Sequence, residues 1–247
     1  MKAAVYSGTR NLYPDMVTAA KTLVKHSSVE KIYFLIEDDK FPEKLPKIIE
    51  TINVSGQQFF PERGANFRTK FSYMSLLRVC YTKILPESVD KVLQLDVDTI
   101  VADDIDELWD VDLEGRWFAA VLEDKSTYKP FGPVYYNIGV TMFNLKQIRE
   151  DFADDLMIYT LNTRKMPYID QDAWNMYWRN KSVQIPGRFN ESIVTHQSGN
   201  PAIVHYAGVK NWQTNGDMKR AEYLKEARKL TWEDVLHGQS TGSHSDV

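Results

Sequence analysis

The segment at residues 91–109, KVLQLDVDTIVADDIDELW, constrains the fold of this chain more than any other. Its apolar run at residues 92–95 is typical of a buried strand. Asp96 and Asp98 follow one residue apart where this run ends. Because side chains two residues apart in an extended segment point the same way, both carboxylates can reach one cation. Ligands of open α/β sheets bind at the carboxyl ends of strands, so the segment predicts a metal or phosphate site.

The chain before this segment reads as strand, helix and strand. Residues 2–6 (KAAVY) and 31–36 (KIYFLI) are apolar enough for buried strands, and residues 14–26 between them have the apolar spacing of a helix. This order predicts a βαβ unit and a mainly parallel sheet. Later strands are expected at residues 51–54, 117–122, 135–145 and 202–205, and helices at 45–50, within 66–85, and at 147–163, 170–179 and 217–230.

Two details of these later segments are informative. In the helix at 147–163, the residues Ile148, Phe152, Leu156 and Tyr159 are expected to form one apolar face. The strand at 135–145 contains Gly139, and a glycine inside a strand often marks a close backbone approach.

Composition sets further limits on the class of protein. A chain of 247 residues can form one sizeable domain, and a net charge of −4 gives no reason to expect a nucleic-acid partner. The single cysteine, Cys80, lies in an apolar run and is expected to be a buried thiol. Residues 1–236 are predicted to form a single domain, and residues 237–247 have the composition of a disordered tail.

Targeting signals are not evident in the sequence. No signal peptide is recognisable at the start, and no apolar stretch approaches the length of a transmembrane span. The protein is therefore expected in the cytoplasm, with peripheral contact to the inner face of a membrane left open. Its oligomeric state is also left open.

A second candidate ligand lies late in the chain. His205 follows an apolar pair and so ends a predicted strand. A histidine there is more often a core or surface residue than a ligand. If its strand neighbours the Asp-X-Asp strand, however, two carboxylates and an imidazole suit a divalent cation such as Mn²⁺. Lys210 follows closely and would place positive charge where a leaving pyrophosphate develops negative charge.

Taken in order, these segments resemble glycosyltransferase family 8, the group of glycogenin and the lipopolysaccharide galactosyl- and glucosyltransferases. The resemblance runs from Met1 to about Trp212. One departure is Asn211, where the family usually has proline. The matching segments are AVYSGTRNLY, Arg78 with Leu85-Pro86, KVLQLDVDTIV with DIDELWDVDL, YYNIGVTMFNL, DQDAWN and HYAGVKNW. The resemblance implies an α/β fold of the GT-A type, which binds nucleotide-sugars on a mainly parallel central sheet flanked by helices.

The resemblance also implies an activity. The enzyme would transfer a hexose from a UDP-sugar to a saccharide, glycolipid or other hydroxyl acceptor, with glucose and galactose as the leading candidates. The anomeric configuration would be retained, and the reaction would depend on Mn²⁺ or Mg²⁺. Carried over by position, the metal ligands would be Asp96, Asp98 and His205. The residues around the UDP-sugar would be Tyr6, Ser7, Thr9, Asn11, Tyr13, Arg78, Asp96, Val97, Asn137, Gly208 and Lys210. The catalytic candidates would be Gln171, Asp170 and Asp172, with Gln171 nearest the anomeric carbon.

Several alternatives stay open at this point. Same-face attack by the acceptor is favoured because a glutamine amide is a poor nucleophile, but Asp170 and Asp172 keep double displacement possible. The strand with DVDTI also fits haloacid-dehalogenase phosphatases, although their motif lies near the start of the domain. Nucleotidyltransferases share the sheet plan but normally have a glycine-rich basic loop after the first strand. A catalytically inactive nucleotide-sugar-binding module would keep the fold without needing the metal set.

Overall fold

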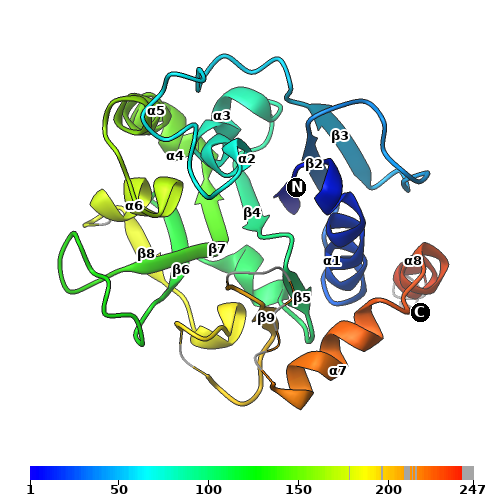
Figure 1. Cartoon of the computed structure of the whole chain (residues 1–247). Helices are drawn as coiled ribbons and strands as arrows, with labels where there is room; N and C mark the ends of the chain where they lie inside the picture. The colour runs from blue at the N-terminus through cyan, green and yellow to red at the C-terminus, as the bar shows by residue number, and fades with distance from the viewer. Residues whose placement is uncertain (178, 196, 209–211, 213, 215, 241–247) are drawn as a thin grey trace.

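A seven-stranded sheet forms the centre of the molecule (Figure 1). The computed structural model describes residues 1–240 except 178, 196, 209–211, 213 and 215. The strand order is β3-β2-β1-β4-β7-β6-β8, with bounds β1 (Ala3–Ser7), β2 (Lys31–Ile36), β3 (Ile49–Asn53), β4 (Lys91–Leu95), β6 (Phe118–Leu122), β7 (Tyr136–Asn144) and β8 (Ser182–Gln184). Among these strands only β7 runs antiparallel to its neighbours. The predicted mainly parallel α/β sheet is therefore confirmed.

Helices cover both faces of this sheet, which explains why its strands are continuous apolar runs. Ala4 and Tyr6 of β1 face the core under α1 (Tyr13–Lys25) and α8 (Trp232–Ser240), whereas Ala3 and Val5 face the opposite core. The helices of that opposite side are α2 (Tyr73–Leu76), α3 (Tyr81–Ile84), α4 (Leu145–Glu150), α5 (Ala153–Thr163) and α6 (Ile169–Met176). Cys80 is buried there, as predicted.

A second, two-stranded sheet lies beside the carboxyl end of β4. It pairs β5 (Thr99–Val101) antiparallel with β9 (Ile203–His205), so that Thr99 lies opposite His205. The helix α7 (Met218–Ala227) packs against this small sheet. The last strand is thus found where it was predicted, but outside the main sheet. The short 3-10 helices are η1 (Arg10–Leu12), η2 (Leu77–Cys80), η3 (Asp106–Asp110) and η4 (Gly187–Asn190).

The predicted helix at residues 147–163 is wrong in its continuity and in its buried face. The chain breaks at Phe152, whose φ of 52° is left-handed, and this separates α4 from α5. Only Ile148 of the expected apolar face is buried, while Phe152 and Tyr159 are each 69% exposed. The break rotates α5 so that Ala153, Met157 and Leu161 face the core instead.

Two other expectations differ from the structure. Residues 45–50 form no helix. The Ile49 N–H instead donates to the Pro46 carbonyl in a turn, and Ile49 starts β3, which pairs with β2. At the other end of the chain, α8 continues to Ser240, so residues 237–240 of the expected disordered tail are helical. Residues 241–247 lie outside the described residues. Within the described part of the chain, no helix combines the length and apolarity that crossing a bilayer requires.

Candidate functional site

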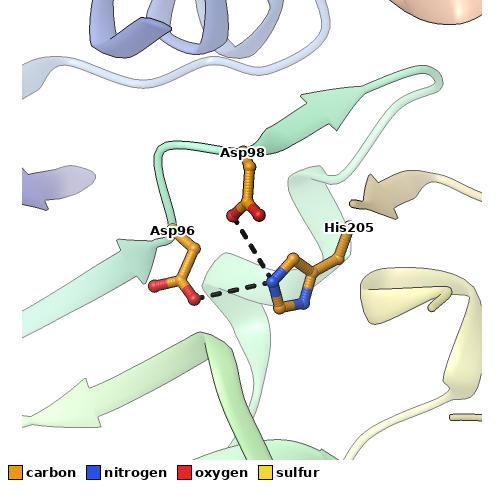
Figure 2. Close-up of side chains that lie close together, drawn as sticks. All are labelled: Asp96, Asp98 and His205. Carbon is orange, nitrogen blue, oxygen red and sulfur yellow. Dashed lines mark ion pairs between the residues drawn. The ribbon is translucent and has the colours of Figure 1, made fainter. Parts of the chain in front are cut away.

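The three predicted metal ligands converge at the carboxyl end of β4 (Figure 2). His205 Nε2 lies 3.5 Å from Asp96 Oδ2 and 3.6 Å from Asp98 Oδ1. One ligand atom from each residue lies within 4.8 Å of the others. The carboxylates converge because the chain turns after Asp96, where the Thr99 hydroxyl donates to the Asp96 carbonyl at 2.7 Å. The predicted cluster is present, but a turn forms it rather than the extended segment that the spacing suggested.

This donor set fits a divalent cation. Two carboxylates and an imidazole are suitable ligands, and water or phosphate oxygens can complete the shell. Burial by itself lowers the pKa of His205, but Asp96 and Asp98 outweigh that effect and raise the pKa to about 9. A cation bound between these groups would replace the proton that the carboxylates hold on the imidazole, since a ligating histidine must be neutral.

Arg78 and Gln94 fix one side of the Asp96 carboxylate. The Arg78 guanidinium donates to Asp96 Oδ1, and the Gln94 amide donates to the same oxygen at 3.1 Å. This leaves Oδ2 facing His205. Burial favours the protonated form of Asp96, but Arg78, His205 and Gln94 together outweigh it, and the pKa of Asp96 is lowered. Arg78 also contacts Asp170 at 3.3 Å, and burial raises the pKa of Asp170 to about 6. Arg78, expected over the sugar or its phosphate, thus joins the metal ligands to α6.

The start of α6 carries the other two catalytic candidates. The Gln171 side chain donates to Glu123 Oε1 at 3.1 Å and accepts from the Ile138 backbone N–H at 3.1 Å. Asp172 is fully buried and accepts three hydrogen bonds, from the Tyr135 hydroxyl at 2.7 Å, the Tyr128 hydroxyl at 3.1 Å and the Tyr168 backbone N–H at 2.9 Å. Asp172 therefore holds the segment that precedes β7 against α6.

Gly139 allows His205 to pack against β7. A β-carbon at this position would lie 2.1 Å from His205 Cε1 and 2.7 Å from its Nδ1. The Gly139 carbonyl also accepts from the Asp96 backbone N–H at 2.7 Å. The close backbone approach that the glycine predicted is confirmed, and it is the imidazole of a metal-ligand candidate that requires the space.

The expected nucleotide loop after β1 divides into enclosed and accessible side chains. Tyr6 is fully buried with its ring edge against Phe34, and the Tyr13 hydroxyl accepts from the Glu37 backbone N–H inside the core. Ser7 and Thr9 are half-buried and Asn11 is exposed, and the Thr9 hydroxyl donates to the Asn11 side chain at 2.7 Å. Val97 is buried and Gly208 is exposed. Lys210 and Asn211 lie outside the described residues.

Sequence reasoning missed three side chains of this site. Glu123 directly follows the apolar strand β6, so the same signal that marked Asp96 could have found it. Gln94 lies inside the apolar run of β4 and reads as an ordinary strand residue. Asn190, which contacts His205 Nδ1 at 2.8 Å, lies in the 3-10 helix η4 and had no signal at all.

Comparison with known proteins gives matches over most of the chain. Residues 4–216 match glycosyl transferase family 8. Glycosyltransferase GlyB of Streptococcus pneumoniae serotype 4 is 28% identical over 148 residues, which cover 51% of this chain and 35% of GlyB. The structure of glycosyltransferase GlyE of S. pneumoniae TIGR4 is similar, with a TM-score of 0.72 and 20% identity, over 100% of this chain and 66% of GlyE. The chain thus spans about a third of the length of GlyB and just under two thirds of GlyE.

The galactosyltransferase LgtC, solved with donor and acceptor sugar analogs, is similar over nearly all of both chains. Its TM-score is 0.64 at 23% identity, and the match covers 94% of this chain and 98% of LgtC. At such identities the structural likeness establishes the GT-A type of fold. The family match, by contrast, includes the Asp-X-Asp segment and His205, and it decides against the phosphatase alternative. On this match the chain belongs to glycosyl transferase family 8.

Proposed function

We propose that this chain transfers a hexose from a UDP-sugar to a hydroxyl group of a saccharide or glycolipid acceptor, with retention at the anomeric carbon. Glucose and galactose are the leading candidates for the hexose. The convergence of Asp96, Asp98 and His205 at the carboxyl end of β4 carries the proposal. Membership of glycosyl transferase family 8 supports sugar transfer as the reaction class.

The proposed cation is Mn²⁺ or Mg²⁺, held by Asp96, Asp98 and His205. When bound, such an ion supplies Lewis acidity to the two phosphates of the sugar donor as UDP departs. Arg78 keeps Asp96 ionised, and Arg78 and Gln94 together keep its Oδ2 directed at the site. Gly208 and Lys210 are proposed to meet the phosphates, while Ser7, Thr9, Asn11 and Val97 are proposed to line uracil and ribose, with the backbone of Tyr6 and Tyr13.

Same-face attack is the mechanism that the side-chain contacts support. The bond from the anomeric carbon to the UDP oxygen breaks, the acceptor oxygen bonds to that carbon from the same side, and the UDP phosphate takes the acceptor proton. Asp170 is bound to Arg78 and Asp172 accepts three hydrogen bonds, so neither carboxylate is disengaged enough to attack. Asn137 and Gln171 are proposed to contact the sugar. Mass spectrometry of the enzyme after exposure to UDP-sugars tests this mechanism, and a sugar covalently bound to Asp170 or Asp172 would exclude it.

Stability measurements with UDP test the sugar-donor site. A ligand that binds only the folded state at about a hundred times its Kd adds roughly 2.7 kcal/mol to the free energy of unfolding. We expect this gain for the wild type with UDP and Mn²⁺, none for Asp98→Asn, and the full gain for Asp110→Asn, an exposed aspartate outside the site. A gain without Mn²⁺ contradicts the metal role. If UDP stabilises the protein but no UDP is released from UDP-sugars, either with acceptors or by hydrolysis, an inactive binding module would be favoured.

A further inference from the structure

An unbroken line of hydrogen bonds runs from the cation site to α6. Its members come from five different parts of the chain and meet where β6 ends and β7 begins. The line joins His205, Asn190, Asn137, Glu123 and Gln171, with successive distances of 2.8, 2.8, 2.7 and 3.1 Å. The first four side chains are buried, so water does not substitute for these partners.

Two consecutive backbone N–H groups of β7 set the polarity of this line. The Gly139 N–H donates to Asn137 Oδ1 at 3.0 Å, which turns Asn137 Nδ2 towards Glu123 Oε1. The Ile138 N–H donates to Gln171 Oε1, which turns Gln171 Nε2 towards the same Glu123 oxygen. Since a backbone N–H can only donate, neither side-chain amide can be reversed without losing its hydrogen bond to the backbone.

The same polarity continues to the histidine. Asn190 Nδ2 donates to Asn137 Oδ1, so Asn190 Oδ1 faces His205 Nδ1. An amide oxygen can only accept, and Nδ1 must therefore carry a proton. The remaining ring nitrogen, Nε2, is the atom that lies towards Asp96 and Asp98. Histidines that bind metals commonly donate their other N–H to an oxygen in this way, which fixes the tautomer and the ring orientation.

We propose that Asn190 and Glu123 are positioning residues. Through Asn137, which lies between them, they orient the His205 imidazole for the cation and the Gln171 amide for the sugar from one shared reference, the backbone of β7. Asn190 acts on His205 directly. Glu123 acts through one of its two carboxylate oxygens, Oε1, which accepts from both amides. This inference rests on the metal site of the proposed function, and it adds the residues that fix the site's geometry.

The test measures Mn²⁺ affinity of the whole chain from the electron paramagnetic resonance signal of free Mn²⁺. Asn190→Ser removes the acceptor for His205 Nδ1 and is expected to weaken Mn²⁺ binding about 10–100-fold, the usual effect of losing such a partner. Asn190→Asp keeps an acceptor for His205 Nδ1 but loses the donor to Asn137 Oδ1, so it is expected to keep more of the Mn²⁺ affinity than Asn190→Ser. The matched control is Asn66→Ser, another buried asparagine, which bonds Leu161, Arg164 and Met166 and no residue of this line, and should not change Mn²⁺ affinity.

The outcomes separate this inference from the proposed function. Wild-type affinity in Asn190→Ser overturns the inference alone, as does an equal loss in Asn190→Asp, because the acceptor for His205 Nδ1 would then make no difference. A wild type that binds no Mn²⁺ overturns both the inference and the proposed metal site. If Asn190→Ser does not fold, nitrogen-15 spectra of the Mg²⁺-loaded wild type decide. They should show that His205 is protonated at Nδ1 only. The His205 signals are identified by their absence in His205→Asn. Protonation at Nε2 instead of Nδ1 would overturn the inference.

Discussion

The two halves of the main sheet are built on different physical terms. Up to Asn53, the half with β1, β2, β3 and α1 buries apolar side chains, and Thr22 is its one buried polar residue. The half with β6, β7 and α6, together with β9, buries Glu123, Asn137, Asp170, Asp172, Asn175 and His205. An apolar core tolerates changes that keep its volume. A buried polar group, by contrast, depends on one particular partner. His205, Asn137 and the α6 residues of the candidate site lie in the second half, where a single substitution can leave a partner unsatisfied.

The largest expected effect in this comparison comes from Arg78→Met. It leaves Asp96 and Asp170 without their buried cation, and removal of one member of a buried ion pair typically costs about 3–5 kcal/mol. Urea unfolding measures the loss. Arg68→Met is the matched control, because its pair with Glu62 is more than 70% exposed on both sides and should contribute less than about 1 kcal/mol. Equal losses in the two variants would contradict the importance of burial.

Asp170 should give the polar half a pH dependence of its own. Its pKa is raised to about 6 in the folded state, so its contribution to stability is fully present below its unfolded pKa and is lost as the pH rises through 6. From about pH 4 to pH 6 the free energy of unfolding should fall by on the order of 3 kcal/mol more in the wild type than in Asp170→Asn. Urea unfolding at a series of pH values, without metal, measures this. Parallel profiles for the two proteins would rule out the raised pKa.

Gly139→Ala should disturb the site more than the fold. The new methyl group would meet the His205 ring, and overpacking of this kind typically costs about 1–3 kcal/mol. The Mn²⁺-dependent stabilisation by UDP should disappear as the imidazole moves. Gly56→Ala has open space around its β-carbon and should leave UDP binding intact and stability unchanged or slightly higher. Retained Mn²⁺-dependent UDP binding in Gly139→Ala would show that β7 can give way.

The smallest predicted effect tests the break between α4 and α5. Phe152→Asn places a residue that tolerates the left-handed region at the N-cap of α5, and a gain of about 0.5–1 kcal/mol is expected. Tyr159→Asn, equally exposed but within the helix, should lower stability slightly. Thermal unfolding distinguishes them, and a lower midpoint for Phe152→Asn would argue against backbone strain at this position.

Apart from residues 45–50, where β3 begins instead of a helix, the apolar half was predictable because the spacing of its apolar residues matches their burial. The βαβ start, the central strand and the buried Cys80 followed from apolar spacing, and the metal-ligand cluster followed from residue types at strand ends together with the family resemblance. The break at Phe152 was not predictable, since an unbroken apolar spacing can equally well be one helix. Asn190 was not predictable either, because a hydrogen bond between residues 190 and 205 depends on tertiary placement that no local pattern encodes.

The pairing of β5 with β9 has a consequence for the order in which the protein is made. Synthesis delivers Asp96 and Asp98 first, and His205 only after all seven strands of the main sheet have been translated. Thr99 can lie opposite His205 only when this late strand docks, and Arg220 of the following helix α7 then donates to the His205 carbonyl. A nascent chain that ends before β9 would therefore carry both acidic ligands but no complete cation site, so metal capture requires that β9 has been made and has docked against β5.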